Sequence, residues 1–161
     1  HEITKTTLVT SAGFRCVRRS VSPDGEAARS ADVLVLDTIG ELAATYANAS
    51  LVFVGGSLVP RGGHNIIEPA LYARPIIVGP HTENFRQIVS DFRAAGAVRQ
   101  LSMDETDPVN IGRVCAELLA NRDESRRMGE RAFQVLESNR GATVRTLGAI
   151  HGTLESARRR G

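Results

Sequence analysis

The stretch of sequence that decides the fold is residues 51–85, LVFVGGSLVPRGGHNIIEPALYARPIIVGPHTENF. Two short apolar runs within it, residues 51–54 and 76–78, have the composition of buried strands in a parallel sheet. Two glycine pairs lie between these runs, at positions 55–56 and 62–63. Because glycine has no Cβ, its backbone amides can approach a ligand closely and its φ can be positive. The stretch therefore predicts a strand, a glycine-rich loop, a helix and a second strand.

A helix is expected to begin within residues 64–69, with Pro69 at its first position, where the missing N–H costs nothing. The unpaired N–H groups and partial positive charge of a helix N-terminus suit a phosphate. The carboxylate of Glu68 would lie at the helix entrance, where it either caps the helix or holds a ribose hydroxyl. These residues alone leave two interpretations open: a nucleotide-binding loop, or a strand-to-helix turn that needs glycine only for its geometry.

The rest of the chain continues the alternation of strands and helices before it becomes wholly helical. Strands are expected at residues 14–18, 33–36, 51–54, 76–78 and 98–101, and further helices at residues 4–11, 41–48, 84–95, 107–120, 122–138 and 142–160. Such alternation predicts an α/β fold with an open, doubly wound parallel sheet. In that architecture ligands bind beyond the carboxyl ends of the strands, where residues 37–41, 55–57 and 79–81 are expected to lie.

The composition of the 161 residues is that of a globular protein, with 42% hydrophobic and 24% charged residues. No run of about 18 apolar residues is present, so we expect no membrane span. A net charge of +2 and an aromatic content of 4% argue against nucleic acid as a partner. The four histidines form no zinc-binding pattern, so we expect no metal site. Cys16 and Cys115 belong to no redox or metal-ligand spacing and are expected to be free thiols.

The longer segment VLDTIGELAATYANASLVFVGGSLVPRGGHNIIEPALYARPIIVGPHTENFRQIVSDF closely resembles the C-terminal domain of 3-deoxy-D-manno-octulosonic acid (Kdo) transferases, GT-B glycosyltransferases of lipopolysaccharide biosynthesis. The similarity covers nearly the whole chain and is densest from Asp37 to Phe92. GGSLVxxGGHNxxEP followed by GPHxxNF is the specific part of it. The resemblance implies a Rossmann-like GT-B donor-binding domain with C-terminal helices. Residues 1–161 would form a single partial domain, truncated at its N-terminal side.

The family resemblance also implies a reaction, the inverting transfer of Kdo from CMP-Kdo to the lipid A precursor, without a metal or cofactor. Full-length members carry an N-terminal acceptor-binding domain with a membrane anchor and a catalytic carboxylate, and this chain contains neither. The resemblance therefore implies no catalytic residue in this chain and a soluble, inactive fragment that binds CMP-Kdo but no nucleic acid. The full-length protein would act at the cytoplasmic face of the bacterial inner membrane, where its N-terminal domain would hold the lipid A precursor.

Two segments match the nucleotide contacts of the family position by position, residues 39–41 (usually MGE) and residues 65–68 (usually NPLE). The candidate nucleotide-binding residues are thus Ile39, Gly40, Glu41, Asn65, Ile66, Ile67 and Glu68. Candidate contacts with the phosphate or the Kdo carboxylate are Gly56, Ser57, Arg61, Gly63 and His64. Structural alternatives stay open for Asn65 and Glu68 as helix caps, and for Arg61 as a solvated loop residue. His81 and Asn84 are expected to hold the loop in place.

Two other functions stay open at this point. The first is the donor-binding half of another GT-B enzyme, a UDP-sugar transferase or epimerase, because such enzymes share the glycine loop and the glutamate-bearing helix. The second is a non-catalytic nucleotide-binding or interaction module that has kept the fold.

Overall fold

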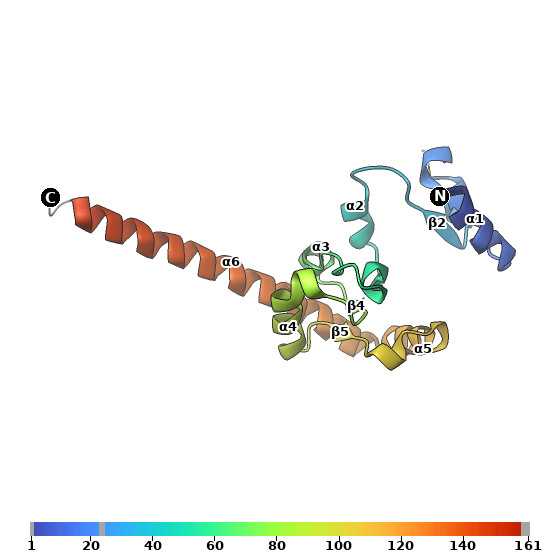
Figure 1. The fold of residues 1–161 in the computed structure, drawn as a ribbon. Coiled ribbons are helices and arrows are strands. Elements are labelled where there is room, and N and C mark those ends of the chain that lie inside the picture. Colours follow the sequence, from blue (N-terminus) through green and yellow to red (C-terminus); the bar gives the residue numbers. More distant parts are fainter. Residues whose placement is uncertain (1, 23–24, 159–161) are drawn as a thin grey trace. The chain divides into compact units, whose positions relative to one another are not determined.

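The structure is a computed structural model that describes residues 2–22 and 25–158 (Figure 1). The chain divides into two compact units, His1–Thr45 and Tyr46–Gly161. The assignment of residues 1–161 to one partial domain stays a prediction. The end of the predicted helix 142–160 lies outside the described residues.

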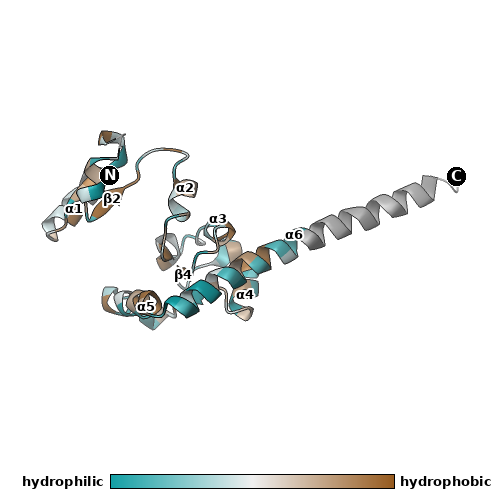
Figure 2. Ribbon diagram, turned by 180° about the vertical axis from the view of Figure 1, so that it is seen from behind, coloured by the Kyte–Doolittle hydropathy of each residue, from teal (hydrophilic) through white to brown (hydrophobic). Residues whose placement is uncertain are grey.

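The first unit is built around two parallel strands. Its elements in chain order are α1 (Glu2–Ser11), β1 (Cys16–Arg18), the 3₁₀ turns η1 (Arg19–Val21) and η2 (Ala27–Ser30), and β2 (Val33–Val35), followed by α2 (Leu42–Tyr46), which reaches the second unit. Cys16 pairs with Val33 and Arg18 with Val35. The apolar character of β2 that predicted a strand is visible in Figure 2. Cys16 is a free thiol.

The second unit contains a three-stranded parallel sheet with the strand order β3-β4-β5. Its elements are β3 (Val52–Val54), η3 (Gly55–Leu58), α3 (Ile67–Leu71), β4 (Ile76–Val78), η4 (Glu83–Phe85), α4 (Arg86–Ala94), β5 (Arg99–Gln100), η5 (Met103–Glu105), α5 (Pro108–Ala120) and α6 (Arg122–Arg158). Phe53 pairs with Ile77, and Ile77 with Arg99 on its other side. The central strand β4 is buried throughout, as its uninterrupted apolar sequence predicts.

Helices cover both faces of this sheet and produce a three-layer arrangement. Val54 and Ile76 belong to a core cluster that includes Ile66 of the loop before α3, Phe92 of α4 and residues of α6. On the opposite face, Ile77 packs with residues of α5. Because successive residues of a strand point to opposite faces, β4 contributes side chains to both clusters. The predicted α/β fold with parallel strands is therefore confirmed.

Each unit has its own hydrogen-bonded parallel sheet, with two strands in the first unit and three in the second. Within the first unit β2 pairs with β1, and the prediction that residues 33–36 share a sheet with residues 51–54 and 76–78 stays a prediction. An apolar run indicates that a strand is covered on its faces. Its hydrogen-bonding edges are backbone groups, so the sequence does not identify the neighbouring strand.

Two helix predictions need correction. Residues 122–138 and 142–160 were expected as separate helices, but α6 continues through Gly141 to Arg158. A glycine in a helix interior costs only about 1 kcal/mol relative to alanine, which is too little to end a helix by itself. Pro69 is the third residue of α3, and not the first. The N–H of the third residue also lacks a partner within a helix, so proline is tolerated there.

Helix α6 crosses the second unit close to the loop after α3. Hydrophilic residues follow its described first half (Figure 2), while Ala132 and Leu136 are buried in the core. A Cβ at Gly129 would overlap the carbonyl group of Ala73. Ala73 itself has a positive φ of 51° after the end of α3. The close approach of the two backbones therefore requires glycine at position 129. None of the described helices is long and apolar enough to cross a membrane.

Substituting alanine for Gly129 tests this crossing. We expect Gly129→Ala to lower the free energy of unfolding by about 1–3 kcal/mol, because the added methyl group forces α6 away from Ala73. Gly112→Ala in α5 is the matched control, since a Cβ there meets nothing within 4 Å. The control should raise stability by up to about 1 kcal/mol through helix propensity. Urea unfolding followed by circular dichroism measures both, and equal stabilisation by the two substitutions would contradict the close contact.

Candidate functional site

The glycine-rich loop after β3 is joined to the loop after β4 by Ser57. Its side chain is buried, and its hydroxyl donates to the Val54 carbonyl oxygen at 2.5 Å. The same oxygen accepts from the Gly79 N–H at 2.6 Å, and the Ser57 carbonyl accepts from the His81 N–H at 3.0 Å. Ser57 thus holds the carboxyl ends of β3 and β4 together. The Ser57 hydroxyl thus has a structural role, and its contact with a donor stays a prediction.

The second glycine pair packs directly against the loop after β4. Gly62 and Gly63 have φ values of +85° and +78°. The Gly62 carbonyl accepts from the Asn84 N–H at 3.1 Å, and a Cβ at Gly62 would collide with the Asn84 side chain. A Cβ at Gly63 would come within 2.8 Å of the His81 carbonyl oxygen. Both glycines are therefore required by the approach of two loops, which accounts for this pair without a ligand.

The side chain of His64 packs against the glycine-rich loop, whereas that of Arg61 makes no contact in the described part of the chain that holds it there. The imidazole of His64 lies over Gly56, where a Cβ would collide with the ring. A side chain at position 56 would therefore displace the His64 ring. Arg61 is exposed, and its guanidinium has no ion pair or hydrogen bond among the described residues. Its positive charge is available to an anion at this edge of the sheet.

At the start of α3, Asn65 and Glu68 have different roles. The Asn65 side-chain oxygen accepts from the Ile67 N–H at 2.9 Å. In this structure Asn65 therefore has the local structural role that the sequence left open beside ligand binding. Ile66 is fully buried in the core. Glu68 is exposed and accepts no hydrogen bond from the helix or from other residues in the described part of the chain. The pKa of Tyr46 is raised, mainly because Tyr46 is partly buried and additionally because of the negative charge of Glu68. The carboxylate of Glu68 does not cap the helix and can accept from a ligand.

The other predicted segment, residues 39–41, follows β2 in the first unit. Ile39 is fully exposed, and Gly40 has a φ of +90°. The Glu41 carboxylate accepts from the Thr38 hydroxyl and from Arg19 Nε at 3.0 Å, and these contacts lower its pKa. Its carboxylate is therefore already engaged. What this segment presents to solvent is the Ile39 side chain and the backbone around it.

Sequence reasoning missed the buried acid beside this segment. The Asp37 carboxylate has only 1% of its side-chain surface exposed and forms an ion pair with Arg18 at 2.7 Å. It also accepts from the Ser20 hydroxyl at 2.6 Å and the Ser20 N–H at 2.9 Å. These hydrogen bonds, with those from Arg18, lower the pKa of Asp37 to about 2. Its position directly after a predicted strand was the available signal in the sequence.

The candidate residues fall into two groups by unit. The segment 39–41 belongs to the first unit, and the segments 56–64 and 65–68 belong to the second. Within the second unit the structure joins the glycine loop to the loop after β4 and leaves the side chains of Arg61 and Glu68 exposed beside them. A cation, a carboxylate and exposed backbone at the carboxyl ends of parallel strands suit a ligand that carries both negative charge and hydroxyl groups.

Comparison with known proteins gives related sequences over nearly the whole chain, although no family model matches it. The 3-deoxy-D-manno-octulosonic acid transferase of Haemophilus influenzae is 34% identical over 148 residues, 92% of this chain and 34% of the relative. The enzyme of the same name from Bordetella pertussis is 38% identical over 144 residues, 89% of this chain and 32% of the relative. The chain thus spans about a third of the length of these relatives.

A solved structure matches the fold as well. The crystal structure of the C-terminal CMP-Kdo binding domain of WaaA from Acinetobacter baumannii aligns with a TM-score of 0.70 and 33% identity. The alignment covers 81% of this chain and 65% of the Acinetobacter domain. The agreement extends to parallel strands flanked by helices, and it supports the architecture predicted from the alternation of strands and helices.

Replacing Ser57 tests the connection between the two loops. Ser57→Ala should lower the free energy of unfolding by about 1–3 kcal/mol, since the Gly79 N–H is left buried without an acceptor. Ser90→Ala, at an exposed position of α4, is the matched control and should change stability by less than about 0.5 kcal/mol. Denaturant unfolding of the two variants decides. Equal stability of the two variants would mean that the Ser57 hydroxyl does not join the strands.

The buried Asp37 generates a prediction about pH. Its folded pKa of about 2 lies below the ordinary 3.8, so its stabilising effect is complete above about pH 4 and is lost as the pH falls towards 2. The difference in the free energy of unfolding between the wild type and Asp37→Asn should therefore become smaller as the pH falls from about 4 towards 2. Carbon NMR of the Asp37 carboxyl should give a midpoint near pH 2, moving upward in Arg18→Ala. A midpoint near 3.8 in the unmodified chain would contradict the buried ion pair.

Proposed function

Because the chain belongs to the family of 3-deoxy-D-manno-octulosonic acid transferases, we propose that it forms the donor-binding part of an enzyme that transfers Kdo from CMP-Kdo to the lipid A precursor. The related Acinetobacter domain is a CMP-Kdo binding domain, which supports CMP-Kdo as the donor. The acceptor, the absence of a metal and cofactor, and action at the cytoplasmic face of the inner membrane are parts of the same proposal. The whole enzyme would act there.

The observation that carries the proposal is the exposed carboxylate of Glu68, without a hydrogen bond among the described residues and beside a glycine loop held in place by buried bonds. A ribose presents two neighbouring hydroxyl donors, and a carboxylate accepts from both in charge-assisted hydrogen bonds. We assign this role to Glu68. The side-chain N–H groups of Asn65 are not used by its bond to Ile67, so they are assigned to the same ligand.

The negative groups of the donor need positive or N–H partners. CMP-Kdo carries a phosphate and the Kdo carboxylate, and we assign Arg61 and the backbone around Gly63 and His64 to them. In the first unit the Glu41 carboxylate is engaged by Arg19, so what this segment itself offers a ligand is the backbone of Ile39 and Gly40. The predicted donor contact through the Ser57 side chain is not part of the proposal, because its hydroxyl is already bonded.

In the proposed reaction an acceptor hydroxyl attacks the anomeric carbon of Kdo, and the bond from that carbon to the phosphate oxygen of CMP breaks. A general base takes the hydroxyl proton, and CMP leaves with an additional negative charge. Donors fixed near that phosphate would stabilise the developing charge. We assign neither the base nor the acceptor site to a residue of this chain. Its part is to bind and orient the donor.

Replacing Glu68 tests the assignment. Glu68→Gln should weaken CMP binding to the chain by about 1–3 kcal/mol, the loss of a charged hydrogen-bond partner. The melting temperature should stay unchanged, because the side chain is exposed and makes no hydrogen bond or ion pair within the described chain. Calorimetric titration with CMP, with Glu117→Gln on α5 as control, measures the effect.

Other results would separate the alternatives. Unchanged CMP affinity with a lowered melting temperature would make Glu68 a structural residue. Tighter binding of UDP than of CMP would favour another nucleotide-sugar enzyme. A chain that is folded and binds neither nucleotide would contradict donor binding by this part of the protein.

A further inference from the structure

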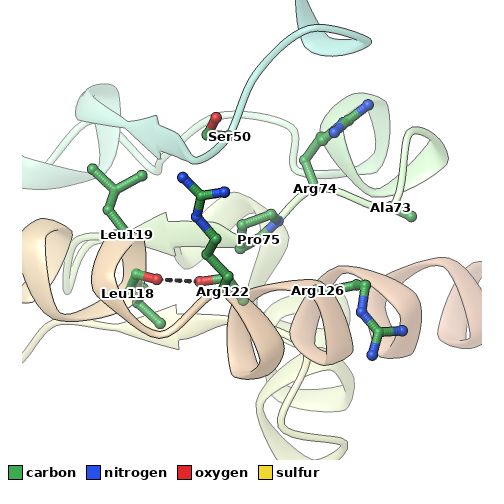
Figure 3. Close-up of a pocket in the computed structure, with 9 residues that line it drawn as sticks. Ser50, Ala73, Arg74, Pro75, Leu118, Leu119, Arg122 and Arg126 are labelled. Atoms are coloured by element: carbon green, nitrogen blue, oxygen red, sulfur yellow. Dashed lines mark hydrogen bonds between the residues drawn. The ribbon is translucent and has the colours of Figure 1, made fainter.

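A cleft of the second unit lies at the amino ends of β3 and β4, whereas the glycine loop lies at the carboxyl end of β3. The cleft has a volume of about 500 Å³ (Figure 3). Ser50, which precedes β3, and Pro75, which precedes β4, line one side of it, and Leu119 of α5 and Arg122 of α6 line the other. Strands β3 and β4 therefore separate the cleft from the glycine-rich loop that follows β3.

The charged residues that line this cleft are all arginines: Arg74, Arg122 and Arg126. Arg126 is paired with Glu130 on the same helix at 2.7 Å. The Arg122 guanidinium points into the hollow towards Ser50 and Pro75, whereas Arg126 points away (Figure 3). Arg122 has no ion pair or hydrogen bond through its side chain within residues 2–22 and 25–158. The cleft therefore contains an unneutralised cation and no carboxylate in its lining.

Arg74 is the second cation of the cleft without an acidic partner in the described part of the chain. Its backbone is held by a hydrogen bond from its N–H to the Pro69 carbonyl at 3.2 Å, and its Nη2 donates to the Ala47 carbonyl. Its Nε is buried without a hydrogen-bond partner, alone in this respect among the described side chains. A buried donor without an acceptor is costly. The Arg74 guanidinium points away from Arg122 in Figure 3, so an anion in the cleft would give Nε a partner once the side chain turns towards it.

We propose that the cleft binds a phosphate monoester, with the phosphate held by Arg122 and Arg74. Guanidinium groups form paired hydrogen bonds with phosphate oxygens, and two of them balance a dianion. The volume exceeds that of a phosphate ion, and the apolar surfaces of Pro75 and Leu119 suit the organic part of an ester. Arg74 rotates towards the phosphate when the ligand binds and thereby removes its Nε from the unpaired position.

Titration of the chain with glycerol 3-phosphate at low ionic strength tests the proposal. Binding should be saturable and should shift the backbone amide resonances of Ser50 and Leu119. Arg122→Ala and Arg74→Ala should each weaken it at least about tenfold, the loss of one charge-assisted hydrogen bond. Arg93→Ala on α4 is the charge-matched control, because Arg93 is exposed, unpaired among the described residues and outside the cleft. Glu68→Gln should leave this binding unchanged.

Phosphatidylcholine vesicles with and without phosphatidic acid distinguish a lipid source of the phosphate from a soluble one. Binding to the phosphatidic acid vesicles alone, lost in Arg122→Ala, would assign the site to a lipid headgroup. Binding of glycerol 3-phosphate alone would assign it to a soluble ester. The proposal is overturned if neither probe binds, or if Arg93→Ala weakens binding as much as Arg122→Ala, since the attraction would then be that of the overall positive charge.

Discussion

The buried hydroxyl of Ser57 is the contact on which the geometry of the candidate site depends. It is both a donor to Val54 at the end of β3 and an acceptor from Gly79 at the end of β4. Two neighbouring parallel strands share no short connection, so their ends are otherwise linked only through the intervening loop and helix. The serine fixes these ends relative to each other. Beside them Arg61 and Glu68 are exposed and make no hydrogen bond or ion pair among the described residues.

Glycine is required where the chain passes so close to itself that a Cβ has no room. Gly63 faces the backbone of the loop after β4, and Gly129 of α6 faces the loop after α3. Gly63 precedes α3 in the chain, and the Ala73 that Gly129 approaches follows α3, a helix of only five residues. Contacts at both ends therefore compensate for the low intrinsic stability of such a helix, which needs tertiary packing to form. The start of α3, with Asn65 and Glu68, is positioned in this way.

The distribution of carboxylates distinguishes structural from available acids. In the first unit the pKa of Asp37 is lowered by hydrogen bonds from Ser20 and then Arg18. The pKa of Glu41 is lowered by hydrogen bonds from Thr38 and then Arg19. Glu68 has no arginine partner among the described residues, although it lies in a chain with many arginines. A charge that the fold does not neutralise keeps its full capacity for a ligand. The same reasoning applies to Arg61 and, at the other ends of the strands, to Arg122.

The sequence by itself determined the elements whose signals are local. Apolar runs located β3 and β4 to within one residue, and Asp107 before Pro108 located the start of α5, where the Asp107 side chain accepts from two backbone N–H groups. The glycine pairs marked the loop correctly. These signals depend on side-chain burial, capping and backbone freedom, which are properties of a few consecutive residues.

Only the tertiary structure decided the relations between segments distant in the sequence. It paired β2 with β1, continued α6 through Gly141, and used the Ser57 hydroxyl to link two strands. The partners of Asp37 likewise come from another segment of the chain. The physical reason is the same in each case. Backbone edges and hydroxyl groups look identical in sequence whether they bind water, a ligand or another part of the chain, and only packing selects among these partners.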